Sequence, residues 1–222
     1  MRMIGKIIKR DLHRAARSGG NWAFGLIFMT IFLALSAIAL NGDMSILREV
    51  GRALIWLAII FASLLSVDKI FAEDLRDGTT GQLWLSGMSY LSQATAGMMS
   101  FALIYLFPLI LSVPILSLLF GLENDTIAGL FIALLCAMPG LAAFTALAGA
   151  LTGAYGKSGF LAIIITAPLL VPIVIIGLAA SQAFAVTGIA AIEYRALIGL
   201  SLLACALSIP ASAAALAVNT DR

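Results

Sequence analysis

Charged residues are scarce in this chain, and their scarcity excludes an ordinary soluble protein. Only 11% of the 222 residues are Asp, Glu, Lys or Arg, whereas 62% are hydrophobic. A soluble domain carries roughly 25% charged residues, which keep its surface hydrated. Lipid must therefore cover most of this surface. The composition predicts an all-α integral membrane protein with no room for a separate soluble domain.

Histidine and cysteine are nearly missing, and this excludes several kinds of chemistry. His13 is the only histidine and lies in a basic segment, so the chain cannot form a buried bis-histidine haem site. Cys136 and Cys205 fall in apolar segments and are expected to be free thiols rather than a disulfide framework or a metal cage. We therefore predict no catalytic residue and no metal site.

Titratable and amide side chains are also missing from the centres of the apolar segments. Ion-coupled transporters usually hold such a group within the membrane, so a secondary transporter is disfavoured. The run Gly156-Lys157-Ser158 resembles the end of a phosphate-binding loop, but Leu151 stands where the motif needs glycine. No nucleotide site is expected. Any movement must be driven from outside this chain.

What the chain does contain is a series of apolar windows free of charge, which predict six transmembrane helices. A membrane-crossing helix needs about 20 apolar residues. The window 78–122 is long enough for two helices, but its first part is polar, so we count one. An even number places both termini on the same side. The predicted spans are residues 22–40, 53–68, 96–120, 127–152, 160–180 and 196–218.

The distribution of Lys and Arg predicts that both termini are cytoplasmic. Short cytoplasmic loops carry an excess of basic residues. The terminal segments and the second and fourth loops hold ten, against three in the other loops. Residues 3–17 alternate apolar and basic side chains at helical spacing and are predicted to lie flat on the inner leaflet. The alternative is a frayed basic leader that serves only to orient the chain. We expect a multi-pass protein of a bacterial inner membrane that does not bind nucleic acid.

Prolines occur only in the predicted spans. Proline removes a backbone hydrogen bond and kinks its helix. The prolines either mark bent helices that line a path or flex, or reflect the ordinary frequency of proline in membrane helices. The candidate hinges are Pro108, Pro114, Pro139, Pro168 and Pro172.

Small residues recur at four-residue spacing in the fourth span. Gly149 and Gly153 form a Gly-xxx-Gly pair, preceded by Ala142 and Ala146 on nearly the same face. Such a strip allows close helix–helix approach. Packing within one subunit is the favoured interpretation, and a homodimer is the alternative.

The segment after the second span combines charge with an apolar stripe. Residues 68–78 are predicted to form one amphipathic helix, ended by Gly78, within a cytoplasmic loop at 68–90. Such a helix can dock into a cleft on a soluble partner, whereas the alternative is a solvated connection. The candidate docking residues are Asp68, Phe71, Glu73, Asp74, Arg76, Asp77 and Gly78.

Several motifs, taken together, resemble a known family. The run Leu65-Ser66-Val67-Asp68-Lys69-Ile70-Phe71, followed by Asp74, Asp77-Gly78 and Leu83, is similar to a loop of the haem exporter protein B (CcmB) family. Further matches cover nearly the whole chain: Arg10-Asp11-Leu12, Arg17, Gly19-Gly20, Pro108-Leu109, Ser112, Pro114, Pro139, Phe144, Gly149-Ala150-Leu151-Thr152, Gly159, Pro168 to Ile173 and Ile176-Gly177. Ser86-Gly87-Met88-Ser89 and Lys157-Ser158 depart from the family pattern.

The resemblance implies an ABC-2-like exporter permease for haem export, or for release of a haem chaperone, in cytochrome c biogenesis. It implies a separate cytoplasmic ABC ATPase subunit that hydrolyses ATP, with residues 68–78 as the coupling helix. Further implied partners are a haem-handling membrane protein, a small membrane subunit and, indirectly, a periplasmic haem chaperone. Haem is then at most a transient ligand. The alternatives are an ABC permease for a lipid, glycan or drug, and a membrane assembly scaffold that transports nothing.

Overall fold

The computed structural model describes residues 2–17, 20, 23–153 and 159–220. The described residues form helices and turns and contain no strand, which confirms the predicted all-α class. In chain order the helices are α1 (Arg2–Arg17), α2 (Phe24–Ala39), α3 (Met44–Leu64), η2 (Val67–Lys69), α4 (Ala72–Arg76), α5 (Thr79–Leu85), α6 (Tyr90–Phe101), the π-helical turn η3 (Ala102–Leu106), α7 (Phe107–Ser117), η4 (Leu118–Phe120), α8 (Asn124–Thr152), α9 (Gly159–Thr187), η6 (Gly188–Ala190) and α10 (Ile192–Thr220).

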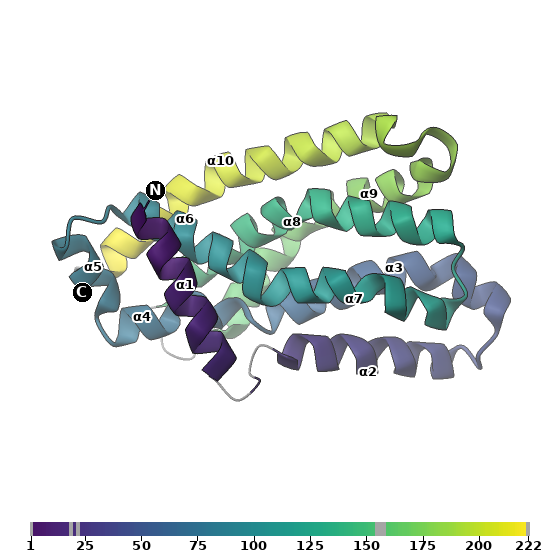
Figure 1. Cartoon of the computed structure of the whole chain (residues 1–222), viewed down its shortest axis with the longest axis horizontal. Helices are drawn as coiled ribbons and strands as arrows, with labels where there is room; N and C mark the ends of the chain where they lie inside the picture. Colours follow the sequence, from purple (N-terminus) through teal and green to yellow (C-terminus); the bar gives the residue numbers. More distant parts are fainter. Residues whose placement is uncertain (1, 18–19, 21–22, 154–158, 221–222) are drawn as a thin grey trace.

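The long helices lie side by side along one axis, and α1 runs across one end of the bundle (Figure 1). The two termini lie at that same end, together with α4 and α5. Four helical segments are long and apolar enough to cross a bilayer: Tyr90–Phe120, Asn124–Thr152, Ile163–Phe184 and Ile192–Thr220. The shorter helix Phe24–Ala39 is also apolar. These helices make the chain a multi-pass membrane protein.

Helix α3 differs most from the prediction, because it begins at Met44 rather than at residue 53. The Asp43 side chain caps its start by accepting a hydrogen bond from the Ser45 amide at 2.9 Å. The bonds from Ser45 hold the pKa of Asp43 below its usual value. Arg48 and Arg52, which the prediction left in a loop, therefore lie in the first half of α3.

Two later helices also begin before the predicted spans. The third apolar helix begins at Tyr90 rather than at residue 96, because Ser89 caps it by accepting a hydrogen bond from the Ser92 amide at 3.3 Å. The last begins at Ile192 rather than at 196. Helix α9 continues to Thr187, seven residues past the predicted end at 180. Polar residues near the ends of these three helices made each predicted span shorter than its helix.

Helix α8 lies at the centre and packs against both α9 and α10. Its small residues let the neighbouring helices approach closely: a methyl group on Gly140 would lie 3.0 Å from Ser201 Cα of α10. At one end of this contact, the buried Tyr194 hydroxyl donates a hydrogen bond to the Gly129 carbonyl at 2.9 Å. At the other end, the Asn219 amide donates to the Ala150 carbonyl at 2.8 Å. These bonds fix the register of α8 against α10.

The prolines differ in what they do to their helices. Pro108 stands two residues after the end of the π-helical turn η3, and the Phe107 amide between them donates to the Ala102 carbonyl, five residues back. This wider turn accommodates the bond that proline cannot make. Pro114, Pro139, Pro168 and Pro172 lie inside helices that continue through them.

Candidate functional site

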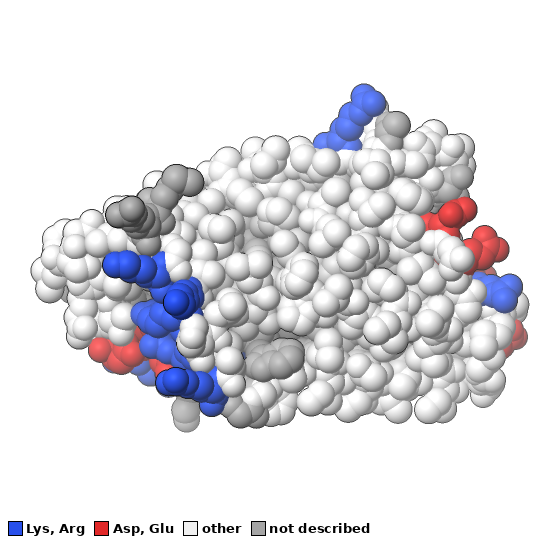
Figure 2. Space-filling model, viewed as in Figure 1, with Lys and Arg blue, Asp and Glu red and all other residues white. Residues whose placement is uncertain are grey.

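The candidate site is the place where α1, α4 and α6 meet at the end of the bundle that holds both termini. We call it the charged junction and define it by Arg10, Asp11 and Arg14 of α1, Glu73 and Asp74 of α4, and Ser100 of α6. Figure 2 shows basic side chains gathered in one band at this end, while most of the visible surface between the two ends carries no charge.

The single helix predicted over residues 68–78 is wrong. The chain instead forms the short turn η2, then breaks at Phe71 and forms the five-residue helix α4. Gly78 does end this segment, because its φ of +74° is in the left-handed region that favours glycine. The break occurs because Phe71 and its neighbours turn inward to fill the space between α6 and α8.

The apolar stripe of this segment packs against the bundle, with Phe71 buried and Ile70 and Leu75 partly buried, so it is not presented as a free face to a partner. Phe71 is only 5% exposed, and its ring lies so close to Gly97 of α6 that a methyl group on this glycine would overlap it. A methyl group on Gly153, the residue that caps the end of α8, would lie 2.7 Å from Leu75 Cδ1. The segment is therefore seated on α6 and α8 through glycines.

The Gly-xxx-Gly pair of α8 accordingly faces the 67–75 segment. A methyl group on Gly149 would lie 2.9 Å from the Val67 carbonyl oxygen. Ala146 lies in the same buried cluster as Phe71, and Ala142 is fully buried in the main core. All four small residues thus pack within the chain, and the two glycines contact a loop rather than another long helix.

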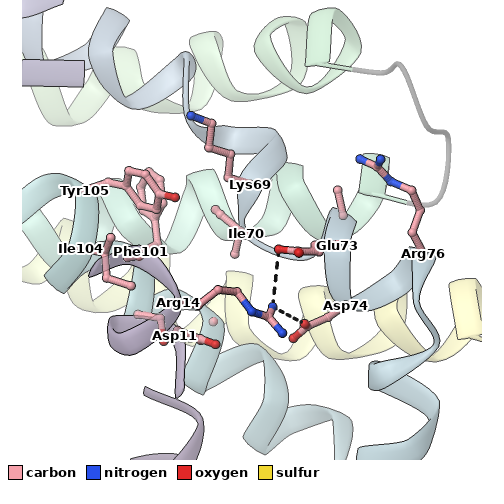
Figure 3. Close-up of a pocket in the computed structure, with 14 residues that line it drawn as sticks. Asp11, Arg14, Lys69, Ile70, Glu73, Asp74, Arg76, Phe101, Ile104 and Tyr105 are labelled. Carbon is pink, nitrogen blue, oxygen red and sulfur yellow. Dashed lines mark hydrogen bonds and ion pairs between the residues drawn. The ribbon is translucent and has the colours of Figure 1, made fainter. Parts of the chain in front are cut away.

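Asp74 ties this seated segment to α1. Its carboxylate accepts a hydrogen bond from Arg10 and a second from Arg14 Nη1 at 2.9 Å. Arg14 also lies 3.5 Å from Glu73 Oε2, as the dashed lines of Figure 3 show. Burial alone would lower the pKa of Arg10, but the bonds and attraction to Asp74 and Asp11 outweigh it and raise that pKa. Both arginines stay charged at any physiological pH.

Helix α1 is also attached to α6. Asp11 accepts hydrogen bonds from Arg10 Nε at 2.9 Å and from the Ser100 hydroxyl at 2.7 Å. Further along α1, Ile7 is buried in a cluster with Met88 and Ala96. The helix that the sequence places on the membrane surface is therefore held to the bundle by both polar and apolar contacts.

The outward face of the loop carries the remaining predicted residues. Glu73, Arg76 and Asp77 are exposed. Asp77 Oδ1 accepts a hydrogen bond from the Thr79 amide at 3.0 Å, and the bonds from Thr79 lower the pKa of Asp77. Beyond it, α5 presents Trp84 and Leu85, which are 52% and 79% exposed. The Asp68 side chain lies outside the described residues.

A cavity of about 220 Å³ lies inside the charged junction, between α1, the 69–76 segment and α6. Arg14, Glu73 and Asp74 line one part of it, and Lys69 and Tyr105 line another (Figure 3). Among the described residues, no three His, Cys, Asp or Glu side chains gather closely enough to hold a metal ion.

The sequence did not single out Arg10, Arg14, Gly97 or Ser100 as site residues. Arg10 and Arg14 stand four residues apart in α1 and therefore share one face, as do Asp11 and Arg14. This spacing was the available signal, but it does not reveal that the face meets a loop some sixty residues away. The basic residues of α1 were already explained by the positive-inside rule, so the sequence offered no reason to look for acidic partners of Arg10 and Arg14.

Comparison with known proteins places the chain in a family. Residues 2–219 match the family model described as CcmB protein. Heme exporter protein B of Bradyrhizobium diazoefficiens is 32% identical over 184 residues, which cover 82% of each chain. Those of Rhodobacter capsulatus and Paracoccus denitrificans are each 30% identical over 96% of this chain and 98% of theirs. These matches confirm the resemblance read from the motifs, and the chain belongs to the CcmB protein family.

Proposed function

We propose that this chain is the membrane permease subunit of a haem-exporting ABC transporter that serves cytochrome c biogenesis, with ATP hydrolysed by a separate cytoplasmic subunit. Membership of the CcmB family and the similarity to proteins named Heme exporter protein B support this assignment. The chain itself contributes no catalytic group in this proposal. It transmits force, either to haem or to the release of a haem-loaded chaperone.

The observation that carries the proposal is the way residues 67–78, which we call the seated loop, pack against the bundle. A subunit driven from outside needs an exposed element that is attached firmly to the membrane helices. Residues 67–78 have an exposed charged face, while Phe71 and Leu75 are inserted between α6 and α8 and Asp74 is bound to α1. A push on this loop must therefore move three helices together, because well-packed contacts do not deform gradually.

The proposed topology has six spans, with α2 and α3 added to the four long apolar segments. At about 1.5 Å per residue, the 21 residues of α3 reach roughly 30 Å, the thickness of the hydrocarbon core. Both termini are then cytoplasmic in the bacterial inner membrane, in an ABC-2-like arrangement, with α1 at the inner interface. The proposed partners are the ATPase, a haem-handling membrane protein, a small membrane subunit, a periplasmic haem chaperone and a second copy of this chain.

Changing Asp77 to Lys is expected to weaken co-purification of the ATPase about tenfold and to lower the yield of holo-cytochrome c. Asp77 lies on the exposed face and contacts α5 only through the Thr79 cap, so a reversed charge acts mainly on a partner. Asp77→Asn keeps an acceptor for the Thr79 amide and should have a much smaller effect. Asp125→Lys places the same charge change at an exposed site on α8. Normal ATPase binding by Asp77→Lys would show that this face does not meet the ATPase.

Changing Pro168 and Pro172 together to Ala is expected to leave membrane insertion intact and to reduce the yield of holo-cytochrome c several-fold. Each substitution allows a backbone hydrogen bond to form within α9, which straightens and stiffens the helix. The matched control is Pro210→Ala in α10. Full activity of the double variant in a strain lacking the wild-type chain would exclude a hinge role for these two prolines.

A further inference from the structure

The cavity of the charged junction has the properties of a binding site that the coupling role does not use. The described residues that line it carry both signs of charge in equal number: the cations Arg14, Lys69 and Arg76, and the carboxylates Asp11, Glu73 and Asp74. A ligand that carries one sign of charge alone would meet repulsion from half of these groups. The lining therefore favours a polar group that is itself zwitterionic.

The internal contacts leave only part of this charge for a ligand. Asp11 and Asp74 are both engaged by arginines, and Asp11 also accepts from Ser100. Glu73 has only the long 3.5 Å pair with Arg14, and its side chain is 71% exposed. Arg76, three residues further along α4, makes no ion pair within the described residues. Glu73 and Arg76, which line the cavity at its exposed edge, thus keep capacity to bind a ligand.

An apolar groove continues from this cavity along the outside of the bundle. Its walls are Leu12 and Ala16 of α1 and Leu103, Ile104, Phe107 and Pro108 of the η3–α7 region. Ile104 lines both the cavity and the groove, so the two spaces adjoin. The π-helical turn and the proline that follows it shape the far wall of the groove. A molecule in both spaces would have a polar end and an apolar end that meet near Ile104.

We infer that the cavity binds the headgroup of a zwitterionic phospholipid of the phosphatidylethanolamine class, with an acyl chain in the adjoining groove. The phosphate would contact the cations of the lining, and the primary ammonium would donate to Glu73. The source of the ligand follows from its place: α1 crosses the end of the apolar helices, which is where lipid headgroups lie. The bound lipid would join α1 to α4 and so stabilise the seated loop. This inference concerns the membrane and does not depend on what the transporter carries.

Haem is the other amphipathic molecule to consider, and the cavity is poorly suited to it. Its two propionates are anionic and would face three carboxylates. Among the described residues of the lining there is no His, Cys or Met to bind its iron, and Tyr105 supplies the one phenol oxygen. Haem therefore serves as a competitor in the test rather than as the proposed ligand.

The test is native mass spectrometry of the purified full-length chain, titrated with phosphatidylethanolamine, phosphatidylcholine and phosphatidylglycerol of identical acyl chains. We expect the ethanolamine lipid to be retained most strongly, because the trimethylammonium of choline offers no N–H to Glu73 and glycerol carries no cation. The variant Glu73→Gln/Arg76→Gln should retain it about tenfold less, as expected for the loss of charged hydrogen bonds. Glu123→Gln, an exposed change of the same kind at the start of α8, should retain it normally.

A second variant addresses the tail. Leu12→Trp fills the groove from an exposed position on α1 and should lower retention of all long-chain lipids while sparing a short-chain ethanolamine lipid. Equal or stronger retention of phosphatidylglycerol by the wild-type chain would overturn the inference. So would unchanged retention by the Glu73→Gln/Arg76→Gln variant. Stoichiometric displacement of the ethanolamine lipid by haemin, lost in Arg14→Gln, would assign the cavity to an anionic ligand instead.

Discussion

Gly97→Ala is expected to destabilise the protein by about 1–3 kcal/mol and to abolish most of its activity in cytochrome c maturation. The added methyl group would overlap the Phe71 ring, which is buried in a cluster with Ala94, Ala146 and Leu216. The Phe71 ring must then move, and the loop loses its packing contact with α6. Thermal unfolding in detergent measures the first effect, and the holo-cytochrome c yield measures the second.

The reciprocal change distinguishes a steric effect from a general loss of folding. Phe71→Leu removes the Cε1 and Cζ atoms that the new methyl group would meet. The double variant Gly97→Ala/Phe71→Leu should therefore recover stability and activity beyond the sum of the single effects. Gly199→Ala in α10 is the matched control, because a methyl group there meets nothing within 4 Å. If Gly97→Ala proved as benign as Gly199→Ala, the close seating of Phe71 would be refuted.

Asp74→Asn is expected to release α1 from the bundle. Arg10 and Arg14 both lose the charge of Asp74, while Arg10 keeps Asp11 and Arg14 keeps the long pair with Glu73. These remaining partners and the partial exposure of the arginines limit the cost to about 1–2 kcal/mol. That is enough to raise the population of undocked α1 roughly tenfold. The effect should be seen as faster tryptic cleavage after Arg14 and Arg17, and as loss of amide protection in α1 during hydrogen exchange.

Two comparisons make this result specific to the ion pairs. Asp77→Asn removes a carboxylate only three residues away, yet Asp77 accepts its hydrogen bond from the Thr79 amide and not from α1. It should leave α1 docked. Arg14→Glu combined with Asp74→Lys restores one pair with reversed signs and should recover part of the protection. Unchanged protection in Asp74→Asn would mean that Ile7 and the Asp11–Ser100 bond hold α1 without help from Asp74.

The sequence predicted the class of the fold well because hydrophobic runs and charge placement depend only on local composition. It predicted α1 for the same reason: apolar and basic residues alternate at helical spacing over residues 3–17. It failed at α3, where Arg48, Glu49 and Arg52 interrupt the apolar run. These charges lie within the helix because Asp43 caps it earlier, and a charge count cannot detect a cap.

The candidate site was predicted in part. The charged loop and Gly78 were identified, and so were the two glycines of α8 on which the loop rests. What a Gly-xxx-Gly pattern does not say is which element occupies the space it opens. A loop whose apolar residues pack inward has the same sequence pattern as a helix whose apolar residues are exposed for a partner. Only the fold brings Phe71 to Gly97 and Asp74 to Arg10.

The π-helical turn before Pro108 determines which side chains face outward in the second half of the helix Tyr90–Phe120. A π turn contains one residue more than an α turn, so every residue after it is rotated by roughly 100° relative to an uninterrupted helix. Deleting one residue between Ala102 and Leu106 would return the helix to regular phase. It would also move Phe107 and Leu111 off the lipid-facing side, where both are now exposed. The side chains before and after the π turn thus have independent orientations about the helix axis. Those before it contact the loop, and those after it face the membrane.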